Sequence, residues 1–329
     1  MMQQRSIELK HALVKPLLKK CGLNLIKKNY RQVSNLSFLG KLIGSAVIKQ
    51  YTDHLTTNNL DDEKQSAYRK FHSTETLLTK IHNDIMLNMS KGEVTMLVLL
   101  DLSAAFDTID HKILLKHLEN RYGVQDSSLC WFKSYISDRS QSVIINDKTS
   151  TKLPLKCGVP QGSKLGPMLF NTYIAPLIEV AAINQVKDQK YADDEQLILS
   201  FKPTFLDQRN AVVKMLKCII EIRKFLHENK LCNNGEKTEL LLIGSQHQLN
   251  KLQVSSIHFD NVVIFDKNMS METQVNKMFR NAYFNIRNIS KIHKSLDKET
   301  CKTAVNALVT PHLDYGNGLL YGTSSRLLY

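Results

Sequence analysis

The stretch from residue 92 to residue 100 constrains the fold more than any other part of the chain. From position 94 onward it is almost entirely apolar, so that a strand formed here would have apolar side chains on both faces. A strand with two apolar faces must be covered on both sides, so we expect it at the centre of a sheet. Asp101 follows directly, which places a carboxylate at the strand end, where ligands commonly bind in layered folds.

Two adjacent carboxylates stand in the segment Tyr191-Ala192-Asp193-Asp194, between two predicted short strands. An acidic dipeptide alone is usually a solvated turn. The third carboxylate, Asp101, changes this interpretation, because acids that end different strands could meet and share two divalent cations. Between them along the chain lies the glycine- and proline-rich loop 158–167, which suits close approach of the backbone to a ligand. Together the three features indicate a metal-dependent polymerase palm.

Three further residues could shape a substrate site. Phe106 lies where the chain turns away from the strand, and its ring would crowd a ribose 2′-hydroxyl, although ordinary core packing is the alternative interpretation. Gln161 and Gly162, in the glycine-proline loop, could contact the incoming base pair or its ribose. Lys237, in a predicted turn, is either a proton donor to pyrophosphate or a solvated lysine.

Arg69 and Lys70 precede a predicted helix whose N-cap is Ser73 or Thr74. Main-chain N–H groups and the helix dipole favour an anion at a helix start, and a triphosphate is one candidate. Within the polymerase interpretation, we therefore expect both side chains to bind the substrate.

Charge and composition narrow the class of protein. The chain carries 44 basic and 31 acidic side chains, a net charge of 44 − 31 = +13, which favours nucleic acid as a partner ahead of an anionic membrane. Its six cysteines show no C-x-x-C spacing, which is typical of thiols in a reducing compartment and indicates no zinc module. No signal peptide is visible, and no apolar run approaches the length of a membrane span. We therefore expect an intracellular protein, nuclear or cytoplasmic, that does not bind a membrane.

Elsewhere the hydrophobic pattern predicts an alternation of helices and strands. Residues 11–20 have roughly helical spacing, and Ser34 or Asn35 is a candidate N-cap for a helix through Ala46. A hairpin is predicted across Asn146-Asp147. A long helix over about 206–229 has four predicted inward-facing residues, Val213, Leu216, Ile220 and Phe225. Beyond Gly244 the composition becomes polar and then basic and helical, which predicts a second, smaller module.

Taken together, the motifs resemble those of the reverse transcriptases of non-LTR (LINE-type) retrotransposons, across nearly the whole chain. The matching stretches, in order, are Asn29-Tyr30-Arg31 with Val33-Ser34-Asn35-Leu36, Gln65-Ser66 with Arg69-Lys70, His72-Ser73-Thr74-Glu75-Thr76, Leu100-Asp101-Leu102-Ser103, Ala105-Phe106-Asp107, Gly158-Val159-Pro160-Gln161-Gly162-Ser163 with Leu165-Gly166-Pro167, Tyr191-Ala192-Asp193-Asp194, Asn229-Lys230-Leu231, Lys237-Thr238-Glu239, and the tail Ala307-Leu308-Val309-Thr310 with Leu313-Asp314-Tyr315. So many motifs in the same order are highly specific.

The resemblance implies an α+β right-hand polymerase fold, with fingers, a palm built on an antiparallel sheet with flanking helices, and a partial helical thumb. Fingers and palm would occupy residues 1–244, and the incomplete thumb residues 245–329. The implied activity copies an RNA template from a DNA primer with dNTPs, using two Mg²⁺ ions, for which Mn²⁺ is the alternative. Asp101, Asp193 and Asp194 match the family's metal-binding aspartates, Phe106 its sugar-discriminating aromatic, Arg69 a triphosphate contact, and Gln161 its substrate-site glutamine.

Several positions depart from the family pattern. Gln32 replaces a common proline, Phe225 a usual tryptophan, and Glu195 adds an acid after the aspartate pair. Residues 261–263 lack the Leu-Gly-Val expected in a loop that helps to position the primer. No endonuclease-like region precedes the polymerase motifs and the chain stops soon after the thumb begins, so we expect a truncated form.

Two alternative functions remain at this point. The first is an inactive or domesticated retrotransposon remnant that binds nucleic acid without polymerising. The second, an RNA-dependent RNA polymerase, is disfavoured by Phe106, because a site that accepts ribonucleotides needs room for the 2′-hydroxyl.

Overall fold

A four-stranded antiparallel sheet forms the centre of the protein. The computed structural model describes residues 10–20, 22–26, 29–103, 105–233, 238–252, 272–293 and 296–314. The sheet has the strand order β11 (Glu239–Ile243), β3 (Val94–Leu100), β9 (Asp194–Phe201) and β8 (Lys187–Tyr191). The two-sided apolar strand β3 therefore lies inside the sheet with a partner on each side, as its sequence predicted.

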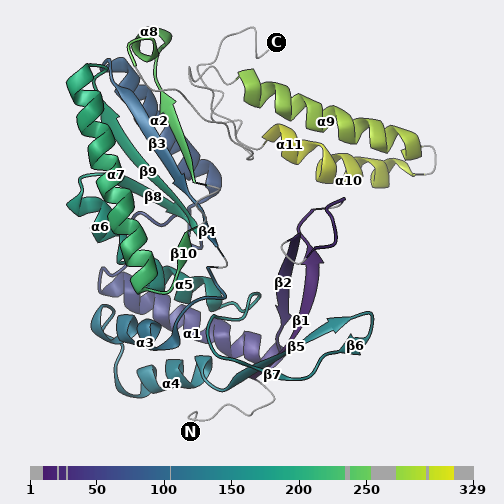
Figure 1. Cartoon of the computed structure of the whole chain (residues 1–329). Coiled ribbons are helices and arrows are strands. Elements are labelled where there is room, and N and C mark those ends of the chain that lie inside the picture. The colour runs from purple at the N-terminus through teal and green to yellow at the C-terminus, as the bar shows by residue number, and fades with distance from the viewer. Residues whose placement is uncertain are drawn as a thin grey trace.

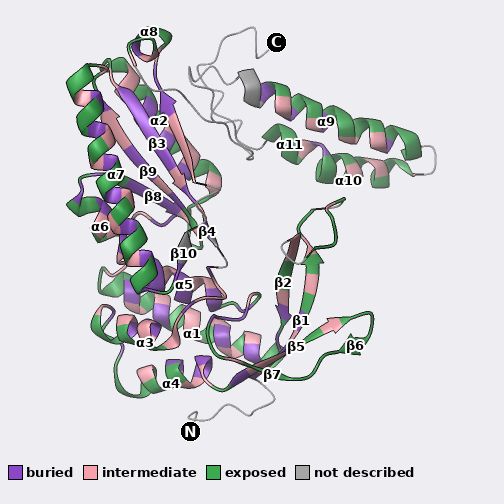
Figure 2. Cartoon of the chain, in the orientation of Figure 1, coloured by how far each residue is buried: buried purple, intermediate pink, exposed green. Residues whose placement is uncertain are grey.

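Helices cover both faces of this sheet (Figure 1). On one face, α2 (Thr74–Ser90) buries Leu77, Ile81 and Ile85 against Leu97 and Ile198. The opposite face carries the even-numbered side chains of β3. It packs into the main core with α5 (Gly166–Ile174), α6 (Leu177–Ile183) and α7 (Phe205–Glu228). Burial of each large aliphatic side chain stabilises such a core by about 1.5–3 kcal/mol. Figure 2 shows β3 as an almost continuously buried strand.

The helix α7 has the predicted length but turns a different face inward. Its buried residues are Gln208, Ala211, Met215, Cys218, Ile222 and Leu226. The predicted inward residues Val213, Leu216 and Ile220 are 60%, 54% and 64% exposed, so that prediction was wrong, and Phe225 is only partly buried. The helix carries two apolar stripes, and the stripe that contacts the sheet is the longer one, with the small residues Ala211 and Cys218 that allow close packing.

A second sheet combines two N-terminal strands with three strands from residues 139–155. It has the order β2 (Tyr30–Asn35), β1 (His11–Leu18), β5 (Arg139–Ile145) and β6 (Lys148–Thr149), with β7 (Leu153–Leu155) also paired to β5. β1 pairs in parallel with β5 and antiparallel with β2. The predicted hairpin turn is confirmed, since Asn146 and Asp147 both adopt positive φ between β5 and β6.

Two predictions for this region were wrong. Residues 11–18 form a strand and not a helix, with Ala12 and Val14 buried on alternate positions. Pro16 is tolerated because the pairing of β1 with β5 ends at Val14. Ser34 and Asn35 lie in β2, and the N-cap of α1 (Phe38–Thr57) is instead Ser37, whose hydroxyl accepts from the Gly40 N–H.

The remaining helices complete two regions. α1, α3 (His111–Asn120) and α4 (Asp126–Ile136) contribute Tyr51, Leu114, Leu118 and Phe132 to the main core, while β4 (Leu102–Ser103) pairs with β10 (Cys232–Asn233). Beyond α8 (Gln246–Leu249), the helices α9 (Glu272–Ile292), α10 (Lys298–Leu308) and α11 (Thr310–Asp314) pack on one another through Ala282, Ile289 and Val309. The helical content predicted beyond residue 270 is confirmed, whereas the boundary at residue 244 stays a prediction.

One stretch, Gly166–Ile183, is long and apolar enough by composition to cross a membrane. The expectation that no run approaches this length overlooked it. Half of the stretch is buried inside the structure, and it is divided between α5 and α6, so it has the properties of core helices.

Candidate active site

Three carboxylates lie at one edge of the central sheet. The strands β8 and β9 form a hairpin in which Tyr191 pairs with Asp194, so that Ala192 and Asp193 make the turn. On the other side of β9, Leu100 of β3 pairs with Glu195. The same antiparallel register carried one step further places Asp101 opposite Asp194. The structure therefore brings the predicted Asp101, Asp193 and Asp194 to the same end of neighbouring strands, here called the acidic edge, and Ala192 and Asp193 form its acidic turn.

The turn of this hairpin is held by a side chain from a distant segment. Ala192 has φ 57°, a left-handed conformation that non-glycine residues seldom adopt. The carboxamide of Gln65, which is 2% exposed, donates to the Ala192 carbonyl at 3.1 Å and accepts from the Ala192 N–H at 2.9 Å. Sequence reasoning placed Gln65 in a family motif without a role, and only the fold shows that it contacts the turn.

The segment that carries Gln65 also places Tyr68 near Asp193 and holds Arg69 in its own loop. The pKa of Tyr68 is raised by partial burial and next by the charge of Asp193, so its phenol stands within electrostatic range of that carboxylate. The Arg69 guanidinium donates to the main-chain carbonyls of Asp62 at 3.0 Å and Gln65 at 3.4 Å. Arg69 therefore braces its own loop, while the side chain of Lys70 is exposed close to the start of α2.

Glu195 does not belong to the acidic edge. Successive strand residues point to opposite faces, so Glu195 turns away from Asp194 and into the protein interior. It is buried, and neither of its carboxylate oxygens has a hydrogen-bond partner. Burial raises the pKa of Glu195 to about 7. The attraction of Lys190 lowers this pKa in part, and the repulsion of Asp188 and Asp62 raises it further. The strand alternation was a signal in the sequence that could have separated Glu195 from the aspartate pair.

Lys190 lies at the centre of this buried group of charges. Its Nζ is 3.3 Å from Asp62 Oδ2 and 3.6 Å from Asp188 Oδ2, and its side chain is 1% exposed. Across the hairpin, Lys190 pairs in register with Glu195. A cluster of ionisable groups therefore lies directly beneath the acidic turn.

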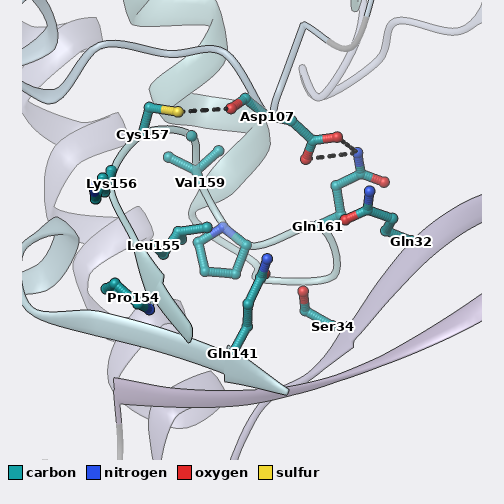
Figure 3. A pocket seen from close by; sticks show the side chains of 12 residues that line it. Gln32, Ser34, Asp107, Gln141, Pro154, Leu155, Lys156, Cys157, Val159 and Gln161 are labelled. Carbon is teal, nitrogen blue, oxygen red and sulfur yellow. Dashed lines mark hydrogen bonds between the residues drawn. The ribbon is translucent and has the colours of Figure 1, made fainter. Parts of the chain in front are cut away.

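The glycine-proline loop is hydrogen-bonded to β2 of the second sheet and to the segment between β4 and α3, and Figure 3 shows the bonds to Asp107 of that segment. The side-chain amide of Gln161 donates to Asp107 Oδ1 at 3.1 Å and Oδ2 at 3.2 Å, and the main-chain carbonyl of Gln161 accepts from the Ser34 N–H of β2 at 2.7 Å. Burial raises the pKa of Asp107, partly offset by the Gln161 hydrogen bonds. Together with their neighbours these residues line a pocket of about 370 Å³.

Two glycines of this loop cannot be replaced without strain. Gly158 has φ +80°, and a Cβ there would lie 2.7 Å from the Asp107 carbonyl oxygen. Gly162 has φ +100°, and its Cβ would lie 2.9 Å from the Ser34 oxygen. The expected close approach of backbone is therefore observed, although the groups approached are parts of the protein itself.

Phe106 is partly buried against the main core. Its ring centroid lies 4.8 Å from that of Phe170 on α5, and its carbonyl accepts from the Val159 N–H. The packing interpretation thus has direct support, while sugar discrimination stays a prediction. Lys237 lies outside the described residues. The segment 261–266, which differs from the family pattern, also lies outside them.

The acidic edge has the donor chemistry that Mg²⁺ prefers. In the ranges that the structure describes, no three His, Cys, Asp or Glu side chains already stand close enough to hold a metal ion. Mg²⁺ is commonly bound by only one or two carboxylates, with water and substrate phosphates completing its shell. The residues present therefore fit a cation that protein and substrate hold jointly.

Comparison with known proteins identifies the family to which the chain is similar. Residues 17–264 match the family model described as "Reverse transcriptase (RNA-dependent DNA polymerase)". The "Probable RNA-directed DNA polymerase from transposon BS" of Drosophila melanogaster is 29% identical over 178 residues, covering 53% of this chain and 19% of the relative. The polymerase from mobile element jockey of the same species is 26% identical, with the same coverage. The Pol polyprotein from type-1 retrotransposable element R2 of Popillia japonica is 32% identical over 29% of this chain and 15% of its own length.

The chain thus spans about a fifth of the length of the first two relatives. Among solved structures, telomerase from Candida tropicalis in complex with a telomeric RNA fragment superimposes with a TM-score of 0.58 at 12% identity, over 98% of this chain and 56% of telomerase. Apo telomerase from the same organism, truncated from its C-terminal domain, superimposes with a TM-score of 0.50 at 14% identity. The match covers 71% of this chain and 50% of that telomerase chain.

At such low identity the structural likeness is evidence for the fold alone. It confirms the predicted α+β right-hand polymerase fold. The names of the curated relatives confirm the resemblance to non-LTR retrotransposon polymerases. Since the family model matches most of the sequence, the chain belongs to the reverse transcriptase (RNA-dependent DNA polymerase) family.

Proposed function

We propose that this chain is the polymerase core of a non-LTR retrotransposon reverse transcriptase. In this proposal it transfers a nucleotide from a dNTP to the 3′-hydroxyl of a DNA primer, directed by an RNA template. The observation that carries the proposal is the register of the central sheet, which gathers Asp101, Asp193 and Asp194 at one edge. Members of the family generally use divalent metal ions, and three neighbouring carboxylates supply suitable oxygen ligands.

The three aspartates would hold two Mg²⁺ ions, or Mn²⁺ as the alternative, together with the substrate phosphates. When bound, two such ions activate the primer hydroxyl and stabilise the leaving pyrophosphate oxygen. Asp193, in the turn, and Asp101, after β3, approach this place from different strands. The sheet therefore fixes the strand ends from which the carboxylates approach, and the ions with the substrate phosphates would draw the side chains together.

The surrounding residues would position the nucleotide. Lys70, exposed near the start of α2, is suited to bind the triphosphate. Arg69 could join it only by exchanging its bonds to the Asp62 and Gln65 carbonyls. Gln161 and Gly162 would contact the incoming base pair, Phe106 would crowd a ribose 2′-hydroxyl, and Lys237 would serve as proton donor.

Primer extension by the purified chain tests the proposal. The assay uses an RNA template, a DNA primer, dNTPs and Mg²⁺, and it compares the unmutated chain with Asp193→Asn. Asp84→Asn is the control, since it removes a carboxylate that pairs with Lys187 on β8, away from the turn. We expect Asp193→Asn to reduce synthesis to the metal-free level while template-primer binding is kept, and Asp84→Asn to extend normally.

Two outcomes would change the assignment. Persistent synthesis by Asp193→Asn would remove Asp193 from the metal ligands. If the unmutated chain and Asp193→Asn both bind the hybrid and neither extends it, the chain is a retrotransposon remnant that keeps the fold without the reaction.

A further inference from the structure

We propose that Gln65 is a positioning residue that sets the backbone of the acidic turn and thereby the direction of the Asp193 carboxylate. This inference rests on the proposed function, because it assigns Asp193 to the reacting centre. Gln65 itself does not touch the substrate in this proposal. It acts through Ala192, which directly precedes Asp193 in the turn.

A single carboxamide satisfies both main-chain groups of Ala192. Gln65 Nε2 donates to the Ala192 carbonyl at 3.1 Å, and Gln65 Oε1 accepts from the Ala192 N–H at 2.9 Å. The same Oε1 accepts from the Ala67 N–H at 3.0 Å, which fixes the side chain within its own loop. The left-handed conformation of Ala192 is unfavourable for a residue with a Cβ, so it persists only where its surroundings hold it. Gln65 supplies that hold.

The segment that carries Gln65 is itself fastened to the hairpin. The Ser66 N–H donates to the Lys190 carbonyl, and the Lys190 N–H donates to the Lys64 carbonyl, both at 2.9 Å. The segment therefore runs beside β8 as a short parallel bridge. The buried contact between Asp62 and Lys190, at 3.3 Å, adds a charged connection. Because these bonds fix the segment, Gln65 transmits the position of the segment to the turn.

Asparagine has the same carboxamide donor and acceptor as glutamine, but its side chain is one methylene shorter. Methionine has the length and volume of glutamine but offers neither a donor nor a strong acceptor. Glutamate keeps an acceptor for the Ala192 N–H, and its ionised carboxylate lacks the donor for the Ala192 carbonyl. The two substitutions therefore separate loss of both bonds from loss of one.

The chain also contains a matched control. Gln248 is buried, donates to the Met89 carbonyl at 3.3 Å and accepts from the Ser245 N–H at 2.7 Å. It joins α8 to the end of α2, away from the acidic turn. Gln248→Met therefore removes an equivalent pair of side-chain bonds to the backbone without touching Ala192.

The first measurement is steady-state primer extension by Gln65→Met, Gln65→Glu and Gln248→Met. Displacing a reacting group by about 1 Å can cost about 100-fold in rate, so we expect Gln65→Met to lower kcat by about 10- to 100-fold. The KM for dNTP and the Kd for template-primer should stay within about twofold, because Gln65 binds neither. Gln65→Glu should retain more of kcat than Gln65→Met, and Gln248→Met should keep kcat. Equal loss of kcat in the two methionine variants would overturn the proposal.

The second measurement does not need an active enzyme. Amide hydrogen exchange of the peptide that contains residues 191–195 reports the Ala192 N–H directly. We expect faster exchange in Gln65→Met, protection close to normal in Gln65→Glu, and no change in Gln248→Met. If the unmutated chain does not polymerise, this pattern still supports the positioning of the turn. Unchanged exchange in Gln65→Met would overturn it, whatever the activity.

Discussion

Replacing Glu195 with glutamine should remove a large pH dependence from the stability of the protein. The carboxyl group is buried in the folded chain, and its pKa is raised from 4.5 to about 7. Burial is the main cause, followed by the partly compensating attraction of Lys190 and by the repulsion of Asp188 and Asp62. Glutamine has nearly the same shape and no charge, so it resembles the protonated glutamate at every pH.

The sign of the effect follows from which state holds the proton more tightly. Below pH 4.5 both the folded and the unfolded chain carry a protonated Glu195, and the group has no pH effect on stability. Between pH 4.5 and about 7 the unfolded chain loses the proton while the folded chain keeps it. The free energy of unfolding therefore falls as pH rises through this window. With about 1.4 kcal/mol for each pKa unit, the total loss is about 3 kcal/mol, complete above about pH 7.

Urea denaturation of the unmutated chain and of Glu195→Gln, across a series of pH values, measures the effect. We expect Glu195→Gln to be similar in stability at pH 4.5 and more stable by about 3 kcal/mol at pH 8. Glu228→Gln is the control, because Glu228 is exposed and its carboxylate pairs with Lys224 on the surface of α7. A constant difference between the two proteins across this range would refute the reasoning. So would a relative gain in stability of the unmutated chain with rising pH, since Lys190 would then hold Glu195 in its charged form.

Three further predictions concern the loop, the aromatic side chain and the basic helices. Gly158→Ala, which forces a Cβ to 2.7 Å from the Asp107 oxygen, should lower the free energy of unfolding by about 1–3 kcal/mol in urea denaturation. Gly123→Ala, also at positive φ but with nothing within 4 Å, should cost less, and an equal loss would contradict the steric argument. Phe106→Ala should raise ribonucleotide incorporation in a competition assay and also destabilise the core it shares with Phe170; unchanged discrimination would leave only packing. Template-primer binding should weaken steeply with salt in a filter-binding assay, and a flat response would argue against phosphate contacts by the basic helices α9 and α10.

The central sheet could be predicted from the sequence because its signal is local. The strand from Val94 to Leu100 has apolar side chains on both of its faces. The helix after Ser73 shows one clear stripe of apolar residues and a capping box. The N-terminal strand was missed because a stretch of eight residues with a proline fits two periodicities about equally well. On α7 the sequence offered two apolar stripes, and only the position of the sheet selects Met215, Cys218 and Ile222 over Val213, Leu216 and Ile220.

The acidic residues of the candidate site could be predicted from the sequence, but the contacts that hold the turn in place could not. Asp101, Asp193 and Asp194 follow from strand ends and turn chemistry, both of which a sequence displays. The bonds between Gln65 and Ala192 join residues 127 positions apart. Because Gln65 binds main-chain groups, which every residue type carries, the identity of Ala192 does not reveal the contact. Roles of this kind become visible only when the backbone is placed.

Several features that cost stability lie near the tip of the β8–β9 hairpin. Within five residues of Asp193 the chain places a left-handed Ala192, a buried Lys190 and a buried Glu195 whose oxygens have no hydrogen-bond partner. Such costs persist where the surrounding structure over-determines the local conformation, and they tend to cluster at functional sites. Here β9 is paired on both sides, and Gln65 binds the turn from outside the sheet. The same rigidity that tolerates these unfavourable residues would hold the main chain that carries Asp193 and Asp194 in one conformation, so that their carboxylates start from fixed positions when ions and substrate bind.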